Sequence, residues 1–442
     1  MRKAIYALLM GFAVLFCGCQ SETQDWAVVH MGNGLIDLQV VPEIGGRVLQ
    51  HKLGDYAYFL VDERLYGKKP PASGVGPDDA WLNYGGDKLW LAPQGWDNDQ
   101  QWPGPPDPVL DGQPYAMEVI GPKEIRLTSR EDARSGVQLS RVIRVFDGTT
   151  HVSIDATMKN IDTKSRRWGI WAHTQFDAGN RHGKGFNENY WAYCPLNKNS
   201  IFPKGYGVQY GLVNNMSYKP DHDNGMMRVH YQRRVGKIGI DSPAGWVATV
   251  DATDGYVFVH RFEYEPDKAY PDNSSVEIWM NGLGEFVAWG EVNKMPEDTR
   301  ANPYNFESEV ISPYANLEPG QEYTYHYEWY SAKIPAGLGI VACGDAGVVC
   351  EALAAVRKGA GLNVTGKFGV FYEGTLKISA FDKDGGEIKV LAFGIDVSPL
   401  ESFDLNLNIE TDLSEVEVIS VSLLDKNEKV IGELANALIS SN

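Results

Sequence analysis

The sequence is dominated by short runs of alternating or β-branched residues that end at turns. The clearest runs cover residues 35–41, 138–146, 150–157 and 246–250. An apolar period of two is typical of β-strands, whereas an amphipathic helix needs a period near 3.6 over a longer window. No long stretch of the sequence keeps that helical period. We therefore expect a nearly all-β protein built from antiparallel strands.

A change in composition near residues 334–337 predicts a boundary between two domains. Aromatic residues are dense before it, whereas no tryptophan follows it and Tyr372 is the only later tyrosine. About 420 residues remain after removal of a signal segment, which is more than one hydrophobic core usually supports. We predict a large antiparallel supersandwich over residues 20–334 and a smaller accessory β-sandwich over residues 338–442. A helical segment is expected at residues 348–358 of the second domain.

Residues 1–19 have the pattern of a bacterial lipoprotein signal peptide. A positively charged start precedes an apolar run over residues 4–16, which is too short to be a permanent membrane span. The run leads to Gly18 and Cys19, which resemble the end of a lipobox. We expect Cys19 to carry the lipid and to become the mature N-terminus.

The residue after Cys19 bears on the cellular location of the protein. Gln20 stands there rather than Asp, which favours the outer membrane by resemblance to lipoprotein sorting rules. An ordinary cleaved signal would instead release the protein into the periplasm. We expect a protein of the bacterial cell envelope that contacts the membrane only through its N-terminal lipid.

The charge of the chain argues against nucleic acid as a partner. Lysine and arginine number 40 against 58 aspartates and glutamates, which gives a formal net charge of −18. A strongly acidic chain repels phosphate backbones and anionic lipid surfaces. No nucleic-acid binding is therefore expected.

Cysteine and histidine spacing predicts no metal and no cofactor. No Cys-x-x-Cys or His-x-x-x-His pattern of a structural zinc site is present. Cys343 and Cys350 are close enough in sequence to pair in an oxidising compartment, which would leave Cys194 alone.

A tryptophan-rich stretch over residues 81–107 is the strongest functional signal. Glycines, prolines, carboxylates and amides interrupt every period there, so we expect a loop. Flat aromatic faces next to such polar groups suit a sugar, which stacks its C–H face and hydrogen-bonds through its hydroxyls. A plug of tryptophans closing one end of a β-sandwich is the structural alternative. The candidate sugar-binding residues of this stretch are Asn83, Asp87, Lys88, Trp90, Trp96 and Trp102.

Three segments in order resemble one family. Residues 33–48 run from a strand into Pro42 and a Gly45-Gly46 turn, where paired glycines allow positive φ and close packing. Residues 159–177 contain an Asn turn and then a strand with His173, and residues 306–323 contain a carboxylate strand and a Pro-Gly turn. These segments are similar to galactose-mutarotase-like (aldose 1-epimerase-like) proteins. The likeness covers residues from about 26 to 333, and the tryptophan-rich stretch is closest to the branch named DUF4380.

The resemblance implies an acid–base site for opening a sugar ring. It places the general acid at His173 and the general base at Glu309 or Glu307, with Glu309 favoured. Trp171 and Gln175 share the strand face of His173, which predicts one concave surface. This chemistry requires His173 and a glutamate to face each other across a cavity as wide as one pyranose ring. The structural alternatives are a core histidine and a solvated acidic strand face.

The sequence leaves three functions open. The Asn-Arg substrate segment of true epimerases is absent, and Arg47 with Lys88 would suit a uronate or another anionic group. One possibility is an aldose 1-epimerase-like isomerase that uses His173 and Glu309. A glycan-binding lipoprotein without turnover is the alternative. An envelope scaffold would not need the aromatic stretch.

Overall fold

The structure is a computed structural model, and it is built almost entirely of β-strands. It describes residues 26–76, 79–288, 290–359, 361–410 and 415–440. Two short 3-10 turns, η1 (Glu63–Leu65) and η2 (Pro271–Asn273), are its helical elements within these ranges. The expectation of a nearly all-β protein is confirmed.

The membrane-related expectations concern residues that the structure does not describe. The predicted signal peptide and the lipidation site at Cys19 both lie outside the described ranges. Within those ranges, no helix has the length and the hydropathy needed to span a lipid bilayer.

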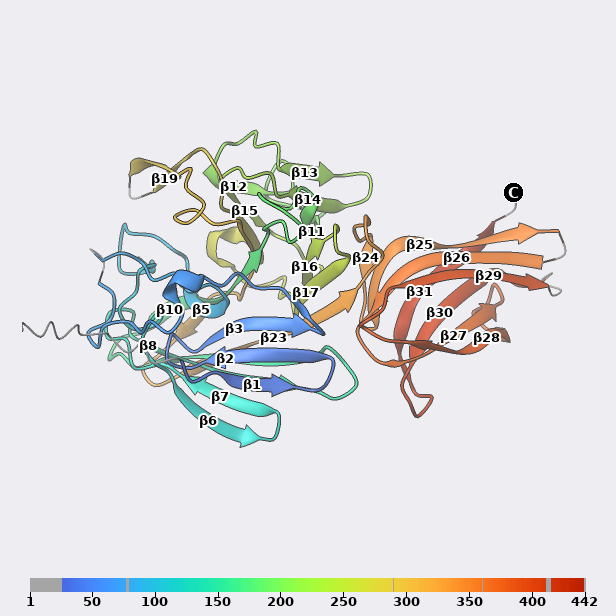
Figure 1. The fold of residues 1–442 in the computed structure, drawn as a ribbon, viewed down its shortest axis with the longest axis horizontal. Coiled ribbons are helices and arrows are strands. Elements are labelled where there is room, and N and C mark those ends of the chain that lie inside the picture. Colours follow the sequence, from blue (N-terminus) through green and yellow to red (C-terminus); the bar gives the residue numbers. More distant parts are fainter. Residues whose placement is uncertain (1–25, 77–78, 289, 360, 411–414, 441–442) are drawn as a thin grey trace, which may run out of the picture.

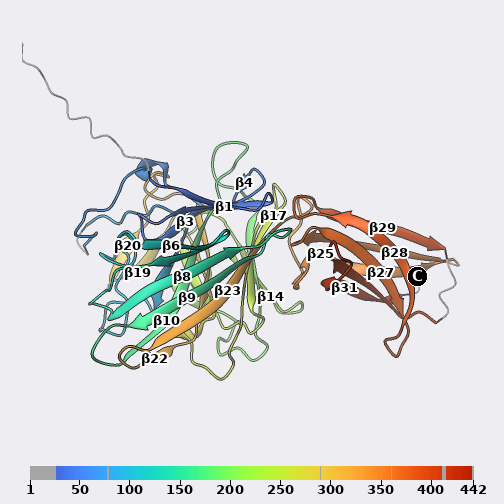
Figure 2. The ribbon, with the colours of Figure 1, turned by 90° about the horizontal axis from the view of Figure 1, so that it is seen from below.

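The main body consists of two large antiparallel sheets that pack face to face (Figures 1 and 2). The first sheet has 11 strands within the described residues: β1 (Val29–Gly32), β2 (Ile36–Val41), β3 (Arg47–Leu53), β4 (Tyr56–Ala57), β5 (Asp87–Ala92), β10 (Arg166–Asp177), β12 (Gly207–Gly211), β15 (Gly236–Ile240), β18 (Val276–Met280), β21 (Asn305–Ile311) and β22 (Ala315–Leu317). The second has 10 by the same count: β6 (Ala116–Gly121), β7 (Glu124–Thr128), β8 (Val137–Val145), β9 (Val152–Asn160), β11 (Tyr190–Pro195), β13 (Tyr218–Asp221), β14 (Met226–His230), β16 (Trp246–Asp251), β17 (Tyr256–Phe262) and β23 (Glu322–Lys333). The predicted antiparallel supersandwich is confirmed.

One large hydrophobic cluster lies between these two sheets. Strand β8 shows why its sequence folds this way, because its residues alternate between buried and half-buried along the whole strand. That alternation leaves one face for the core and the other for solvent. Strand β10 is buried over nearly its full length, since it lies in the middle of the first sheet.

The glycine pair Gly45-Gly46 adopts the predicted conformation. Both residues have positive φ, at 78° and 59°. A Cβ atom on Gly45 would lie 2.1 Å from the carbonyl oxygen of Asp111, and one on Gly46 would lie 2.6 Å from the ring of Tyr115. Only glycine fits such a turn without displacing its neighbours.

The tryptophan-rich stretch is not a loop throughout, which corrects the prediction. Its residues Asp87–Ala92 form β5, a fully buried strand between β3 and β10. Gly85 and Gly86 precede it with positive φ and hold the turn against the backbone of Leu60 and Val48. This strand is only six residues long and is buried on both faces, so no alternation of apolar and polar residues distinguishes it from the irregular segments around it.

The C-terminal part forms a third sheet beside the main body (Figure 1). Its eight described strands are β24 (Ala342–Cys343), β25 (Gly347–Lys358), β26 (Gly361–Val370), β27 (Gly374–Phe381), β28 (Glu387–Val397), β29 (Phe403–Glu410), β30 (Val418–Leu424) and β31 (Val430–Ser440). They enclose a hydrophobic cluster of their own. The helix expected at residues 348–358 is wrong, because this segment pairs with β26 over its length as strand β25. Pairing along the ladder outweighs the helix propensity of its alanines, leucine and basic residues.

A further hydrophobic cluster joins the C-terminal sheet to the main body. It brings Trp246 and Tyr330 of the second sheet against Val348, Cys350 and Phe371. The accessory part therefore packs on the main body, and its independent folding stays a prediction. The three cysteines among the described residues, Cys194, Cys343 and Cys350, are free.

Candidate functional site

The register of four neighbouring strands brings charged residues into one row. Lys88 of β5 lies opposite His173 of β10, and His173 lies opposite Glu309 of β21. Glu309 in turn lies opposite Glu277 of β18. Because paired residues in a sheet point to the same face, these side chains share the outer face of the first sheet.

The next row on the same face lies two residues along each strand. It places Gln175 opposite Glu307, Glu307 opposite Trp279, and Trp279 opposite Lys237 of β15. The period of two along β10 and β21 therefore sets His173 and Gln175 beside Glu309 and Glu307.

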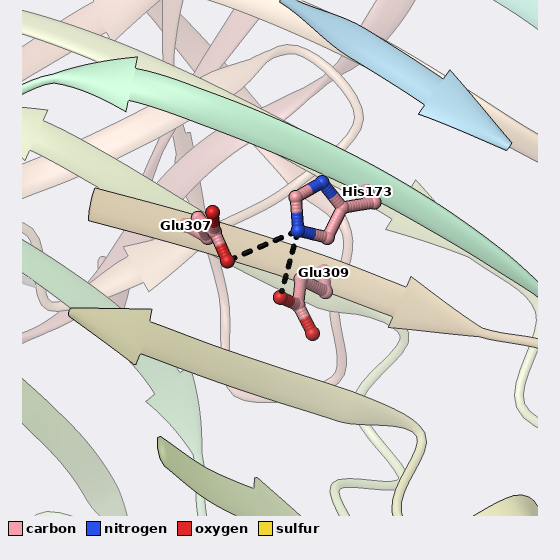
Figure 3. A group of neighbouring side chains, drawn as sticks. All are labelled: His173, Glu307 and Glu309. Atoms are coloured by element: carbon pink, nitrogen blue, oxygen red, sulfur yellow. Dashed lines mark hydrogen bonds and ion pairs between the residues drawn. The ribbon is translucent and has the colours of Figure 1, made fainter. Parts of the chain in front are cut away.

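His173 contacts both glutamates (Figure 3). Its Nε2 atom is 3.0 Å from Glu307 Oε2 and 3.4 Å from Glu309 Oε1. All three side chains are buried, with exposed fractions of 2%, 5% and 1% for His173, Glu307 and Glu309. The predicted gap between His173 and a glutamate as wide as a pyranose ring is therefore absent.

The far oxygen of each carboxylate is held by its own donors. Gln175 Nε2 and Asn305 Nδ2 donate to Glu307 Oε1 over 2.8 and 2.6 Å. Trp171 Nε1 donates to Glu309 Oε2 over 2.9 Å, and Lys237 Nζ lies 3.2 Å from the same oxygen. These contacts turn the near oxygens, Glu307 Oε2 and Glu309 Oε1, toward the imidazole.

Burial shifts the protonation of this cluster. It lowers the pKa of His173 well below its usual range, and the nearby Lys88 charge adds to the effect. It raises the pKa of Glu309 to about 7, against the opposing effects of Lys237 and His173. A neutral imidazole beside a carboxyl group that titrates near neutrality can exchange a proton with a ligand. Which of His173 and the glutamates acts as the acid and which as the base stays a prediction.

The two lysines of the site differ in their environment. Burial, together with the nearby Arg47 charge, lowers the pKa of Lys88 to about 7. Burial also acts to lower the pKa of Lys237, but Glu277 and Glu309 outweigh this effect and raise it. Glu277 Oε2 lies 2.5 Å from Lys237 Nζ, so this ammonium group is already neutralised.

The cluster forms the wall of a cavity of about 870 Å³. The indole rings of five tryptophans line it, while η1 and the hairpin of β19 (Glu285–Ala288) and β20 (Glu291–Lys294) contribute to its rim. The tryptophans are Trp81, Trp90, Trp96, Trp171 and Trp279. A smaller cavity of about 150 Å³ adjoins it and shares Trp171 and Lys237 with it.

Hydrogen bonds at the indole nitrogens orient the rings. Trp81 and Trp90 both donate to the carboxylate of Asp111, over 2.6 and 2.9 Å. Trp96 donates to the carbonyl of Pro103 over 2.9 Å. Their indole N–H groups are thus satisfied by protein. The Trp90 ring also packs against His173, with 4.0 Å between the ring centres.

Eight of the predicted residues line the cavity. They are Asn83, Trp90, Trp96, Trp171, His173, Gln175, Glu307 and Glu309. Lys88 lies directly behind them, where its Nζ donates to Gln175 Oε1 over 2.9 Å and sits 4.8 Å from the centre of the Trp90 ring.

Arg47 does not reach the cavity, contrary to the prediction. Its guanidinium group is completely buried and donates to Asp111 Oδ1 over 2.9 Å and to the Gly85 carbonyl over 3.2 Å. Asp111 thus neutralises Arg47, so this arginine provides no free charge for a uronate or another anionic group.

Asp87 and Trp102 also lie outside the cavity, for different reasons. Asp87 precedes Lys88 in strand β5 and so points to the opposite face, where it contacts Arg141 and accepts from Thr174 Oγ1 over 2.8 Å. Trp102 is completely buried behind Trp90, with its Nε1 bonded to Asp107 Oδ2. Trp102 is therefore a buried core side chain.

The sequence prediction missed Lys237, Glu277, Trp279 and Asn305. Asn305 could have been found, because it precedes Glu307 by two residues and must share its face. The other three come from β15 and β18, and nothing in their local sequence indicates which strand they pair with.

The comparisons with known proteins concern the main body. A family model described as "Domain of unknown function (DUF4380)" matches residues 27–332. No curated protein matches the chain in sequence.

Several solved structures are similar to the chain at low identity. A galactose mutarotase-like protein from Lactobacillus casei has 12% identity and a TM-score of 0.44, with 69% of this chain and 100% of that chain covered. A putative mutarotase from Salmonella typhimurium has 13% identity and a TM-score of 0.43, with 70% and 91% covered. A putative aldose 1-epimerase from Escherichia coli has 11% identity and a TM-score of 0.41, with 70% and 99% covered.

Proposed function

The chain belongs to the DUF4380 family over residues 27–332, and from that premise we propose that the cavity of this family domain binds a carbohydrate. The observation that carries the proposal is the combination of five indole rings and a buried polar cluster in one cavity. The cavity volume of about 870 Å³ falls in the range of about 300 to 1,000 Å³ that is usual for small-ligand sites.

The polar groups suit a ligand rich in hydroxyls. Asn83 and Gln94 line the same cavity as the indoles and are half-buried, and an amide side chain carries both donors and an acceptor. A sugar presents an apolar C–H face for the rings and hydroxyls for the amides and carboxylates. A purely apolar ligand would leave Glu309 Oε1, which accepts no hydrogen bond from the described residues, without a partner, and this costs free energy.

We propose that the same cluster transfers protons at the anomeric carbon of the bound sugar. His173 Nε2 and Glu309 Oε1 are 3.4 Å apart, so no ring fits between them. The ring oxygen and the anomeric hydroxyl are attached to one carbon, however, so an acid and a base side by side can serve both oxygens from one direction. The proposed reaction is ring opening or epimerisation of an aldose.

Binding without turnover is the second candidate function, because one observation favours it. His173 is already in contact with both carboxylates. A cluster whose members satisfy one another can serve as a fixed polar wall for a glycan without transferring a proton.

Sugar binding is tested by a glycan array followed by calorimetry on the variant Trp96→Ala. Trp96 is half-buried at the cavity, so its removal should weaken sugar affinity by about 1 to 3 kcal/mol. Trp191→Ala is the matched control, because Trp191 is also half-buried but lies on the second sheet. Binding of no neutral or acidic saccharide would defeat the proposal, as would equal losses in both variants.

Turnover is tested by a ring-opening assay on Glu309→Gln and His173→Ala. If the cluster transfers protons, each variant should lose about two or more orders of magnitude in rate while sugar binding survives. Unchanged rates would refute the proposed proton transfer and would favour binding without turnover.

We also propose that a lipid on Cys19 holds the protein in the cell envelope, from the lipobox-like end of its N-terminal segment. Cys19→Ala should move the protein from the membrane fraction to the soluble periplasm. Unchanged fractionation would refute the anchor.

A further inference from the structure

We propose that His173, Glu307 and Glu309 form a binding site for one divalent transition-metal ion in the cavity wall. The ligand atoms would be His173 Nε2, Glu307 Oε2 and Glu309 Oε1, which converge on one point (Figure 3). This inference goes beyond carbohydrate binding and stands independently of it, because the cation would be held by protein atoms alone.

The spacing of the three atoms fits a metal polyhedron. They all lie within 4.8 Å of one another, and His173 Nε2 is 3.0 and 3.4 Å from the two carboxylate oxygens. A metal bound at about 2.1 Å from each ligand separates neighbouring ligands by about 3.0 Å at a right angle and about 3.4 Å at the tetrahedral angle. The two distances from His173 Nε2 therefore match those between neighbouring ligands of one metal ion.

The surrounding donors fix the carboxylates as a metal site requires. Gln175 and Asn305 hold Glu307 Oε1, and Trp171 and Lys237 hold Glu309 Oε2. Outer partners of this kind orient metal ligands and raise affinity.

One oxygen of the cluster lacks a hydrogen-bond donor. Glu309 Oε1 is buried and accepts no hydrogen bond from any residue that the structure describes. It points toward His173 Nε2, which already lies closer to Glu307 Oε2. A buried carboxylate oxygen without a donor is costly, and a cation between the three groups would satisfy it.

The positively charged side chains nearby do not fully neutralise the two carboxylates. Lys237 contacts Glu309 but lies even closer to Glu277. Lys88, opposite His173, donates to Gln175 and contacts neither carboxylate directly. Glu307 has no contacting ammonium or guanidinium group among the described residues, since amides hold its far oxygen. Two carboxylates thus face the metal position with little competition.

The donor set indicates the class of metal. One imidazole nitrogen with two carboxylate oxygens suits Zn²⁺, Mn²⁺ or Fe²⁺ better than Ca²⁺ or Mg²⁺, which prefer oxygen alone. His173 Nδ1 has no acceptor among the described residues. Because a metal-bound histidine is normally held through its second nitrogen, we expect weaker binding than at a structural zinc site.

A bound cation and a transferred proton would compete for His173. Its Nε2 lone pair cannot hold a cation and accept a proton at the same time. A bound cation should therefore inhibit proton transfer while leaving the indole faces of the cavity available to a sugar.

The test is calorimetric titration of the chelator-treated full chain with ZnCl₂ and MnCl₂, with MgCl₂ for comparison. A single Zn²⁺ or Mn²⁺ per chain should bind more tightly than Mg²⁺, and added Co²⁺ should give a visible absorption band. Glu309→Gln, which keeps the side-chain shape, should weaken Zn²⁺ binding by at least about 100-fold and abolish the Co²⁺ band.

Two kinds of further variant keep the test decisive. Asn305→Ala leaves all three ligands in place and should weaken Zn²⁺ binding by about 10- to 100-fold through loss of an outer donor. Glu63→Gln and His182→Ala are matched controls at exposed positions, Glu63 on the cavity rim and His182 away from it, and should change nothing. Absence of Zn²⁺ and Mn²⁺ binding, unchanged affinity in Glu309→Gln, or equal losses in the exposed controls would overturn the proposal. The sugar titrations are done without metal, so failure here leaves their outcome untouched.

Discussion

The two faces of strands β5, β10 and β21 both carry buried polar side chains; one face borders the large cavity, and the other lies toward the second sheet. On the face toward the second sheet, Asp87 contacts Arg141 directly and accepts from Thr174. On the cavity face, Glu309 is equally buried, yet its Oε1 accepts no hydrogen bond from the described residues. Burial of a charge alone therefore does not indicate a functional site. We expect a functional site where an incompletely satisfied charge lies beside a cavity.

The inter-sheet face should be the more sensitive to loss of charge. Asp87→Ala leaves the guanidinium group of Arg141 buried without its carboxylate, which should lower the free energy of unfolding by about 3 to 5 kcal/mol. Urea denaturation measures this loss.

A double variant sharpens that prediction. Asp87→Leu combined with Arg141→Met replaces the pair by apolar groups and should recover most of the loss, because no charge is then stranded. If Asp87→Ala lowered the free energy of unfolding only slightly, the proposed difference between the two faces would be contradicted.

Acid should act through two buried histidines between the sheets, His51 of β3 and His260 of β17. Burial lowers the pKa of His51 and of His260 to about 3, from an ordinary value of 6.5. His51 faces Ser331, and His260 faces Thr174. Since the unfolded chain takes up these protons first, their stabilisation is complete above pH 6.5 and is lost as the pH falls toward 3.

The expected slope is about 1.4 kcal/mol per pH unit for each imidazole. His260→Gln should therefore reduce the pH dependence of the unfolding free energy below pH 6.5. An identical pH profile for this variant and the wild type would show that His260 does not titrate as its burial implies.

The cavity face should tolerate loss of charge better. Glu309→Gln keeps an acceptor for Trp171, and Lys237 keeps its contact with Glu277. The unfolding free energy should change by less than about 1.5 kcal/mol, the scale of one net hydrogen bond. A loss as large as that of Asp87→Ala would mean that Glu309 is a structural charge like Asp87.

Local sequence was sufficient to predict part of the site. The period of two along β10 and β21 was enough to group His173 with Gln175 and Glu307 with Glu309. Pairing between these strands, which puts His173 opposite Glu309, depends on register, and resemblance to a family rather than local pattern suggested it.

The sequence predictions that were wrong also failed because strand geometry and strand pairing cannot be seen in the local sequence. Asp87 and Lys88 were treated as neighbours in a loop, but in a strand consecutive residues point to opposite faces. Segment 348–358 looked helical because its composition favours a helix, yet pairing with β26 decides its structure. Lys237 and Glu277 come from strands whose partners no local pattern specifies, so the second half of the charge cluster was not predictable.

The most direct test of the central claim is a crystal structure of the full chain grown with a saccharide that binds on the glycan array. The account predicts electron density for the sugar in the cavity, with its ring against Trp96 and an oxygen atom within hydrogen-bond distance of His173 or Glu309. A sugar bound elsewhere, with the cavity wall around His173 untouched, would contradict it.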